Sequence, residues 1–393
     1  MLTPAARQGR ETMQVHAPVQ NLVLYLTDDC NLRCSYCFVP EGTRRMSADI
    51  ARKAVDFFLT RHVSGTCQRL EITFFGGEPF LEPERMREVM EYARAARPNV
   101  HKWVTFSATT NGTFATPEVE RLVKEFRMNL LVSLDGSEAA SVCRRFASGA
   151  PSWPVVAGNL PKLARWSREA LVRMTFHPGA LKLRENVQVA LDLGAHGVAL
   201  CPVAEAPWQD HLGDLGDAFD ELGSRFIDEA RAGRLYPLEI TCLLLRELHE
   251  ARMRGGRPRR PCAVGSLLLA VDPEGNVMPC HRFIGRPGEW LGSVGEARLS
   301  ADRMEYVTLS PEDFQVCRDC EAAPVCGGGC RVVALNAGKG LRGAHPGHCA
   351  VTRAHARAVR RIYQTLEPER NPVLAGILGG QRPRVLSPSE FLC

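Results

Sequence analysis

The chain has 393 residues, with 49 Lys and Arg against 44 Asp and Glu, which gives a formal net charge of +5. This balance is too even to favour a nucleic-acid partner, and no run approaches the roughly 20 apolar residues of a membrane helix. Residues 1–20 lack the apolar segment of a secretory signal. We therefore expect a cytoplasmic protein whose fifteen cysteines bind metal rather than form disulfides.

From residue 22 onward, short apolar runs alternate with longer segments of helical periodicity, the pattern of βα units and a parallel sheet. Ser47 suits a helix N-cap and Pro83 suits the first turn of a helix. After a polar lead-in at 1–20, residues 21–233 are predicted to form an α/β fold, a partial (β/α)6 TIM-like barrel. The predicted strands are 22–27, 70–75, 104–109, 130–134, 171–176 and 197–201, with further helices near 117–127, 155–166, 184–194 and 217–232.

The alternation stops after residue 233, and we predict a connector over residues 234–261. Its basic stretch 252–260 suits a solvated linker, and contact with an acidic peptide is the alternative. Residues 262–366 contain seven cysteines and few apolar runs, so this domain would depend on metal for its folding. A helix is expected near 350–366, and the tail 367–393 is expected to be irregular.

The run from Cys30 to Cys37 has the spacing C-x3-C-x2-C and follows the first predicted strand. Three thiolates on one short loop can bind three irons of a four-iron cluster and leave the fourth iron open. Zinc sites usually combine two C-x2-C pairs, which fits this triplet poorly. The loop also lies at the carboxyl end of a strand, where parallel α/β folds place their chemistry. An iron–sulfur centre on Cys30, Cys34 and Cys37 is therefore the favoured interpretation, with a zinc loop as the alternative.

This triplet, with Tyr36 before its last cysteine, resembles the core motif of the radical SAM superfamily. The resemblance implies that S-adenosylmethionine chelates the open iron through its amino and carboxylate groups. One electron from the cluster would then cleave the sulfonium to give methionine and a 5′-deoxyadenosyl radical, which abstracts hydrogen from a substrate. Cys30, Cys34 and Cys37 would be the catalytic residues, and Tyr36 would contact the cofactor.

Residues 76–79 follow the second predicted strand and resemble the GGEP motif of the same family. Paired glycines let a backbone approach a ligand closely. The resemblance implies that Gly76, Gly77 and Glu78 contact the methionine amino group, whereas a tight turn with a surface glutamate is the plain alternative.

Other polar residues follow the later strands. Asn111 ends the third predicted strand, where a small polar side chain can meet the ribose, and an Asn-Gly turn is the alternative. In similar enzymes a serine at the position of Ser133 binds the ribose and an arginine at the position of Arg145 binds the methionine carboxylate. The His-Asp pair usual between them is missing here. His177, at the fifth strand end, is equally compatible with a structural role and with substrate contact.

A second set of cysteines stands near the C-terminus. Two zinc sites are the plain interpretation, but seven cysteines cannot fill two four-cysteine sites without help from His281, His345 or His348. The spacing resembles the SPASM domain, a Cys-rich iron–sulfur domain with two auxiliary [4Fe-4S] clusters. The resemblance implies a distal cluster on Cys317, Cys320, Cys326 and Cys349, and a proximal cluster on Cys262, Cys280 and Cys330. Either Cys242 would supply the fourth ligand of the proximal cluster, or its fourth iron is open to an exchangeable ligand or substrate, which is the favoured interpretation.

Residues 278–283 and 291–294 are most similar to radical SAM maturases of ribosomally made peptides (RiPPs). This resemblance implies hydrogen abstraction from a precursor peptide and a C–C or C–S (thioether) crosslink. It also implies a reductant such as flavodoxin or ferredoxin, and a separate leader-recognition protein is a further expected partner. The alternatives are two-electron oxidation, as in anaerobic sulfatase maturases or on a small alcohol, and a non-enzymatic iron–sulfur electron carrier.

Overall fold

The computed structural model describes residues 19–60, 68–100, 103–255, 262–296, 299–300, 302–309 and 313–380. Their strands form one nine-stranded sheet in the order β6-β5-β4-β3-β2-β1-β7-β8-β9. Each of the six predicted strands is confirmed, with ends that differ by at most two residues. These parallel strands are β1 (Asn21–Tyr25), β2 (Arg69–Phe75), β3 (Trp103–Thr110), β4 (Asn129–Ser133), β5 (Glu169–Phe176) and β6 (Gly197–Pro202).

The cysteine-rich segment extends this same sheet. β7 (Leu268–Val271) pairs in parallel with β1, and β8 (Asn276–Met278) and β9 (Gly292–Ser293) follow in antiparallel order. Strands of two to four residues are too short to show a hydrophobic period, so the sequence pattern did not predict them. As a consequence, the segment that carries the second cysteine set pairs with β1, the strand that precedes the first cysteine set.

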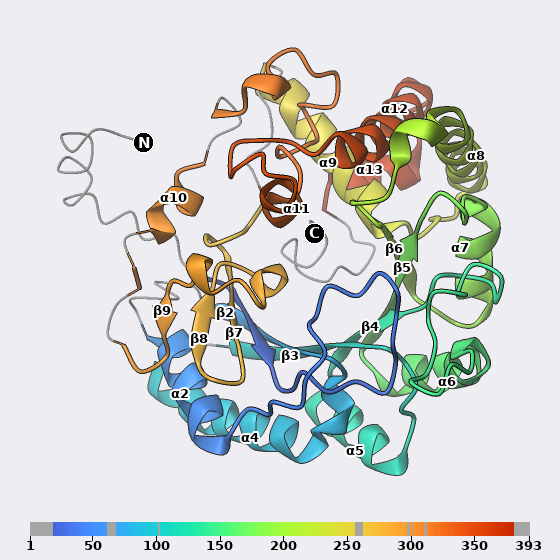
Figure 1. The fold of residues 1–393 in the computed structure, drawn as a ribbon. Coiled ribbons are helices and arrows are strands. Elements are labelled where there is room, and N and C mark those ends of the chain that lie inside the picture. The colour runs from blue at the N-terminus through green and yellow to red at the C-terminus, as the bar shows by residue number, and fades with distance from the viewer. Residues whose placement is uncertain are drawn as a thin grey trace, which may run out of the picture.

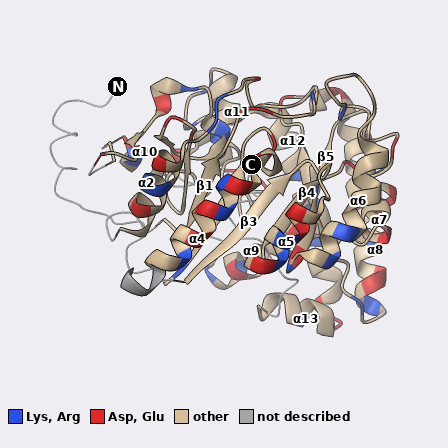
Figure 2. Ribbon diagram, turned by 90° about the horizontal axis from the view of Figure 1, so that it is seen from below, with Lys and Arg blue, Asp and Glu red and all other residues tan. Residues whose placement is uncertain are grey.

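Helices cover the outer side of the parallel strands, which form an arc in Figure 1. The Ser47 hydroxyl accepts a hydrogen bond from the Ile50 amide and starts α2 as predicted. In Figure 2 the charged residues lie along these helices with both signs mixed, and the Arg87–Glu125 pair joins two neighbouring helices. The outer helices are α2 (Ala48–Leu59), α4 (Pro83–Val100), α5 (Pro117–Phe126), α6 (Trp153–Trp166), α7 (Leu183–Asp192) and α8 (Leu212–Arg231).

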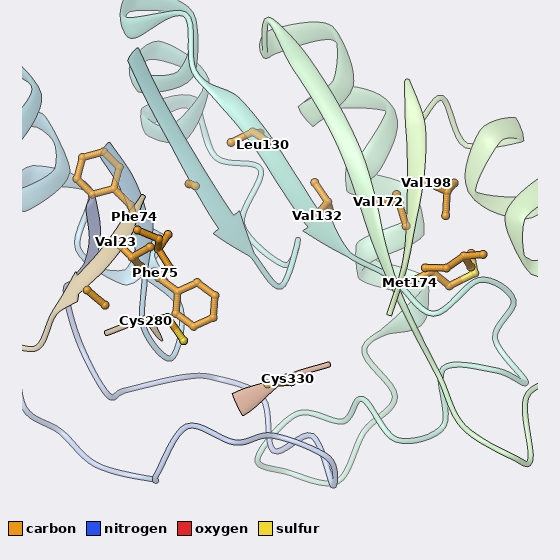
Figure 3. Packing of buried hydrophobic residues seen from close by; sticks show 14 of the residues in the cluster. Val23, Phe74, Phe75, Leu130, Val132, Val172, Met174, Val198, Cys280 and Cys330 are labelled. Carbon is orange, nitrogen blue, oxygen red and sulfur yellow. The ribbon is translucent and has the colours of Figure 1, made fainter. Parts of the chain in front are cut away.

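The core lies between the strands and these helices, and Figure 3 shows apolar side chains such as Val132 on β4 and Val172 on β5 projecting from neighbouring strands. Alternate residues of a strand face opposite sides. Leu131, Leu171 and Ala199 therefore form a smaller cluster on the other face, where Ile240 packs against them.

Two segments that were expected to lack regular structure are helical. The predicted connector 234–261 contains α9 (Glu239–Met253), which packs against β6 and α12 (Pro346–Leu366), the helix predicted near 350–366. The predicted tail contains α13 (Pro372–Leu378), whose start is capped by the Asn371 side chain, so the expectation of an irregular tail is wrong for these residues. Short helices α10 (Arg303–Val307) and α11 (Arg331–Asn336) lie between the cysteines.

None of the helices in the described ranges combines the length and the apolar character needed to cross a bilayer.

Phe106 tests the packing of helices on the sheet. It is 3% exposed on β3, and its ring lies 6.0 Å from the ring of Phe126 on α5. Phe106→Ala should lower the free energy of unfolding by about 3–5 kcal/mol, because the substitution leaves a cavity in the core. Urea denaturation of the purified protein measures this. Trp103→Ala on the same strand is the control, since Trp103 is 62% exposed, and its effect should stay below about 1 kcal/mol.

Candidate active site

The predicted cysteine triplet lies in the loop that follows β1. Cys30 and Cys34 are partly buried, Cys37 is exposed, and all three thiols are free. Burial, together with Cys37 and Cys30, raises the pKa of Cys34 to about 11, although Arg144 opposes the rise. Three thiolates in this position therefore need a cationic partner, which an iron–sulfur cluster supplies.

The triplet opens into a cavity of about 910 Å³ at the carboxyl ends of the strands. The cavity brings together most of the residues that the sequence singled out: Cys30, Cys34, Tyr36, Cys37, Gly76, Gly77, Asn111 and Ser133. Its remaining wall includes Phe38, Phe75, Arg144, Arg173, Thr175, Cys201, Pro202, Glu205 and Arg282.

Gly76 and Gly77 are required by a close approach of two backbones. A Cβ on Gly76 would lie 2.3 Å from the Thr27 carbonyl oxygen, and a Cβ on Gly77 would lie 2.1 Å from that of Asp29. Gly76 also has φ +143°, a conformation that side chains disfavour. The Gly77 amide donates to the Thr27 carbonyl at 2.8 Å. The paired glycines thus clamp the start of the cysteine loop onto the end of β2.

Glu78 is wholly buried and its carboxylate is engaged by the protein. It accepts hydrogen bonds from the Phe80 amide (3.0 Å), the Thr110 hydroxyl (2.8 Å) and the Asn111 amide (2.6 Å). Burial raises its pKa to about 7, although these donors and Arg144 oppose the shift. These contacts join the end of β2 to the end of β3, and the contact of this carboxylate with a methionine amino group stays a prediction.

Asn111 lies at the edge of the cysteine loop. Its side-chain amide donates to Asn31 at 2.8 Å and contacts the Cys30 sulfur at 3.6 Å. The Leu32 amide also donates to this sulfur at 3.4 Å. Burial raises the pKa of Cys30, and these two donors oppose the rise.

Arg144, rather than the predicted Arg145, has its guanidinium in the cavity. Arg144 donates to the Tyr36 hydroxyl at 3.2 Å and to the Asn111 carbonyl at 3.4 Å, and Tyr36 in turn donates to Asp135 at 2.6 Å. Burial lowers the pKa of Arg144, but the charges of Tyr36, Asp135 and Cys34 outweigh this effect and raise it. The exposed Arg145 side chain donates to the carbonyls of Val142 and Gly149 instead.

The Arg145 backbone still anchors the cysteine loop, because its carbonyl accepts from the Arg33 amide at 2.7 Å. A buried carboxylate needs a cation or donors, so Asp135 was the signal that would have pointed to a buried arginine nearby.

His177 lies beside the loop and has local partners. Its Nδ1 accepts from the Gly179 amide at 3.2 Å, and its Nε2 lies 3.8 Å from the Cys143 sulfur. The structural interpretation of this histidine agrees with these contacts.

Four C-terminal cysteines gather as the predicted distal set. Burial raises the pKa of Cys349 to about 11, and the thiolates of Cys326, Cys317 and Cys320 contribute to the rise. The amides of Gly328 and Gly329 donate to the Cys326 sulfur. Backbone donors of this kind stabilise thiolates and tune iron–sulfur centres. In the described ranges, no three His, Cys, Asp or Glu side chains are arranged to hold a single metal ion.

Arg331 organises the loop that carries these cysteines. Its guanidinium is buried, stacks over Phe314 at 4.4 Å, and donates to the carbonyls of Gly329 and Leu341. Burial lowers its pKa, while the thiolates of Cys262, Cys330, Cys326 and Cys317 oppose that shift. The arginine thus lies among members of both predicted cysteine sets.

A second cavity of about 780 Å³ separates the barrel from the cysteine-rich segment. Cys262, Cys326 and His348 line it together with apolar side chains of β6, α8, α9 and α12. Cys201 and Pro202, at the end of β6, line both cavities and therefore form the wall between them. Burial raises the pKa of the Tyr25 phenol, and the charges of Cys280 and Cys37 contribute to the rise. Figure 3 shows Phe75 beside Cys280.

The raised pKa of Glu78 predicts a pH dependence of stability. A carboxyl whose native pKa is about 7 binds its proton more tightly in the folded state, so this stabilisation is full below about pH 4.5 and is lost as the pH rises through about 7. The free energy of unfolding of the apo protein should fall by about 3 kcal/mol over this range relative to Glu78→Gln. Urea titrations of both proteins at several pH values measure the difference. A constant difference across this range would show that Glu78 ionises normally.

Comparison with known proteins agrees with this geometry. Residues 24–179 match the model of the Radical SAM superfamily. The PqqA peptide cyclase of Gluconobacter oxydans is 25% identical over 380 residues, which cover 91% of this chain and 98% of that protein. A cysteine-type anaerobic sulfatase-maturating enzyme of Clostridium novyi is 23% identical over 343 residues, or 79% of this chain and 87% of that protein. An uncharacterized protein of Methanocaldococcus jannaschii is 27% identical over 135 residues, and there the chain spans less than half (45%) of its relative.

Solved structures share the fold. The structure of native anSMEcpe with bound AdoMet matches with a TM-score of 0.72 at 16% identity, over 93% of this chain and 100% of that one. Streptococcus suis SuiB bound to its precursor peptide SuiA matches with a TM-score of 0.53 at 13% identity, over 85% of this chain and 76% of that one. Residues 24–179, which carry the cysteine triplet and the paired glycines at the ends of the parallel strands, thus match the Radical SAM superfamily.

Proposed function

We propose that this radical SAM enzyme abstracts hydrogen from a ribosomally made precursor peptide and joins two of its side chains by a C–C or C–S bond. The observation that carries the proposal is the match to a peptide cyclase over nearly the whole of both chains. The structure of SuiB with a precursor peptide supports it, because that fold accommodates a peptide.

The family implies a [4Fe-4S] cluster and S-adenosylmethionine, which together supply a 5′-deoxyadenosyl radical when they are bound. In this chain Cys30, Cys34 and Cys37 would hold the cluster. Their donor set fits it, because the thiols are free and lie together at one cavity wall. The Gly76–Gly77 turn would present its backbone to the methionine amino group.

Ser133 and Asn111 remain candidates for the ribose, since both line the cavity. We assign the methionine carboxylate to Arg144, which lines the same cavity and is held in place by Tyr36 and Asp135. Tyr36 would then act as a positioning residue for Arg144.

The rest of the cavity suits a peptide side chain. Arg282 lies over the Phe38 ring at 5.0 Å and donates to Glu205 at 3.1 Å, so an apolar surface adjoins a charged rim. Such a wall can orient a target carbon and exclude water, and proximity and orientation dominate reactions of this kind.

We further propose that the C-terminal cysteines hold two auxiliary [4Fe-4S] clusters, distal on Cys317, Cys320, Cys326 and Cys349 and proximal on Cys262, Cys280 and Cys330. The distal set is supported by its electrostatics, because its cysteines contribute to the raised pKa values of Cys317 and Cys349. The auxiliary clusters would accept or relay the electron released on bond formation. A reductant such as flavodoxin or ferredoxin and a separate leader-recognition protein are the proposed partners.

Two-electron oxidation of a protein side chain is the second candidate function. The match to the sulfatase-maturating enzyme favours it. That reaction needs a base for the hydroxyl or thiol proton, and Glu78 is engaged by three donors in this chain. This contact pattern favours the crosslinking proposal.

Cys34→Ala tests the proposed activity. Anaerobically reconstituted wild-type protein with dithionite should form 5′-deoxyadenosine, and a co-expressed precursor peptide should lose the mass of two hydrogens for each crosslink. Cys34→Ala should abolish both while retaining auxiliary iron, because only the catalytic cluster loses a ligand. Liquid chromatography with mass spectrometry measures both products. Normal 5′-deoxyadenosine formation in the variant would refute the assignment.

Arg144 and Arg145 form a matched pair for the cofactor site. Arg144→Lys should weaken S-adenosylmethionine binding about tenfold or more, because lysine cannot keep the two contacts of the buried guanidinium while binding a carboxylate. Arg145→Lys should leave the affinity within about twofold, since this side chain is exposed and contacts only its own loop. Anaerobic equilibrium dialysis measures both, and the opposite ranking would restore Arg145 as the carboxylate ligand.

A further inference from the structure

The proximal set of cysteines has three members, whereas a four-iron cluster in a protein commonly has four cysteine ligands. Cys242 was the candidate from sequence for the missing ligand. Its helix α9 faces the second cavity with Ile240 and Leu244, and residues two positions from these point to another side of a helix. Cys242 is 1% exposed and does not line the cavity that contains Cys262. The structure therefore directs attention to another donor.

His348 lies in that cavity, on the first turn of α12. Its imidazole abuts Gly329, the neighbour of Cys330, since a Cβ on this glycine would lie 2.7 Å from the His348 Cδ2 and 3.1 Å from its Nε2. The ring is therefore in contact with the segment that carries one proximal cysteine and faces the space lined by another, Cys262.

His348 directly precedes Cys349, and Cys326 lines the same cavity, so cysteines of both proposed sets lie near this histidine. The distal set already has four cysteines, and only the proximal set lacks a fourth ligand. His348 Nδ1 is buried and has no hydrogen-bond partner in the described ranges. A buried imidazole with an unused nitrogen is costly unless a partner binds it.

We propose that His348 is the fourth protein ligand of the proximal auxiliary cluster, together with Cys262, Cys280 and Cys330. The inference rests on the proposed auxiliary clusters. Imidazole is a common ligand of iron, and it replaces thiolate in some iron–sulfur centres. A neutral imidazole in place of a thiolate removes one negative charge from the cluster, which raises its reduction potential. The proximal cluster would accordingly be suited to accept an electron from the substrate side.

His281 is the competing histidine, because it follows Cys280 and both of its ring nitrogens are buried without a partner in the described part of the chain. Its ring lies 5.0 Å from that of Phe75 and 6.0 Å from that of Phe38, both of which line the first cavity. It does not line the second cavity. His281 is therefore the internal comparison for His348.

The test uses full-length protein with Cys30, Cys34 and Cys37 replaced by alanine, so that only auxiliary iron is present. This protein is labelled with ¹⁵N-histidine, reconstituted anaerobically and reduced with dithionite. Pulsed EPR should detect a ¹⁵N nucleus bound directly to a cluster. His348→Ala in this background should abolish the nitrogen coupling, and His281→Ala should retain it.

His348→Cys keeps the test informative if the alanine variant fails to fold. It should retain iron, lose the nitrogen coupling and lower the midpoint potential, since thiolate replaces imidazole. His355→Gln is the matched control: His355 also lines the cavity, but its Nε2 is paired with the Thr241 hydroxyl at 2.9 Å, so the nitrogen coupling should persist.

The possible results distinguish a wrong assignment of His348 from an absence of the auxiliary clusters. The assignment of His348 would be overturned by full auxiliary iron without nitrogen coupling, or by coupling that persists in His348→Cys. Either result would still support the auxiliary clusters. Protein that binds no auxiliary iron would overturn the clusters and the ligand together.

Discussion

The close approach of two backbones at the ends of β1 and β2 is the constraint on which the site depends. Gly76 and Gly77 permit it, because any side chain there would meet the carbonyls of Thr27 and Asp29. The cysteine loop begins at this contact, and the buried carboxylate of Glu78 links the same turn to β3 through Thr110 and Asn111. The three strand ends are thereby fixed to one another, and the thiols of the loop face a cavity whose walls they share.

Charge compensation accounts for the polar groups buried around the two cysteine regions. Thiolates and a carboxylate in low dielectric need cations or donors, and this chain supplies Arg144 beside Tyr36 and Asp135, and Arg331 among the C-terminal cysteines. Both guanidiniums are buried, so their positions are determined by packing as well as by charge. The end of β6 separates the two cavities, which places the triplet on one side of this strand end and Cys262 and Cys326 on the other.

The sequence predicted what depends on local pattern. The six parallel strands follow from apolar runs bounded by turn residues, and the cysteine and glycine motifs follow from their spacing. The sequence did not predict that Arg144, rather than the adjacent Arg145, points into the cavity. Contacts with Tyr36 and Asn111, which belong to distant loops, determine this orientation. The joining of β7 to β1 and the helix α9 were missed for a similar reason, since tertiary pairing stabilises segments whose own pattern is weak. The sequence offered His348 as one of three histidines that could help to complete a zinc site, and the fold brings it to the cavity of Cys262.

The central claim is that Cys30, Cys34 and Cys37 hold a four-iron cluster whose fourth iron is open to S-adenosylmethionine. The most direct measurement is the EPR spectrum of the anaerobically reduced protein before and after addition of S-adenosylmethionine, compared with the variant that lacks these three cysteines. The account predicts that the cofactor alters the spectrum of the wild-type protein and leaves that of the variant unchanged. A wild-type spectrum that does not respond to S-adenosylmethionine would contradict it.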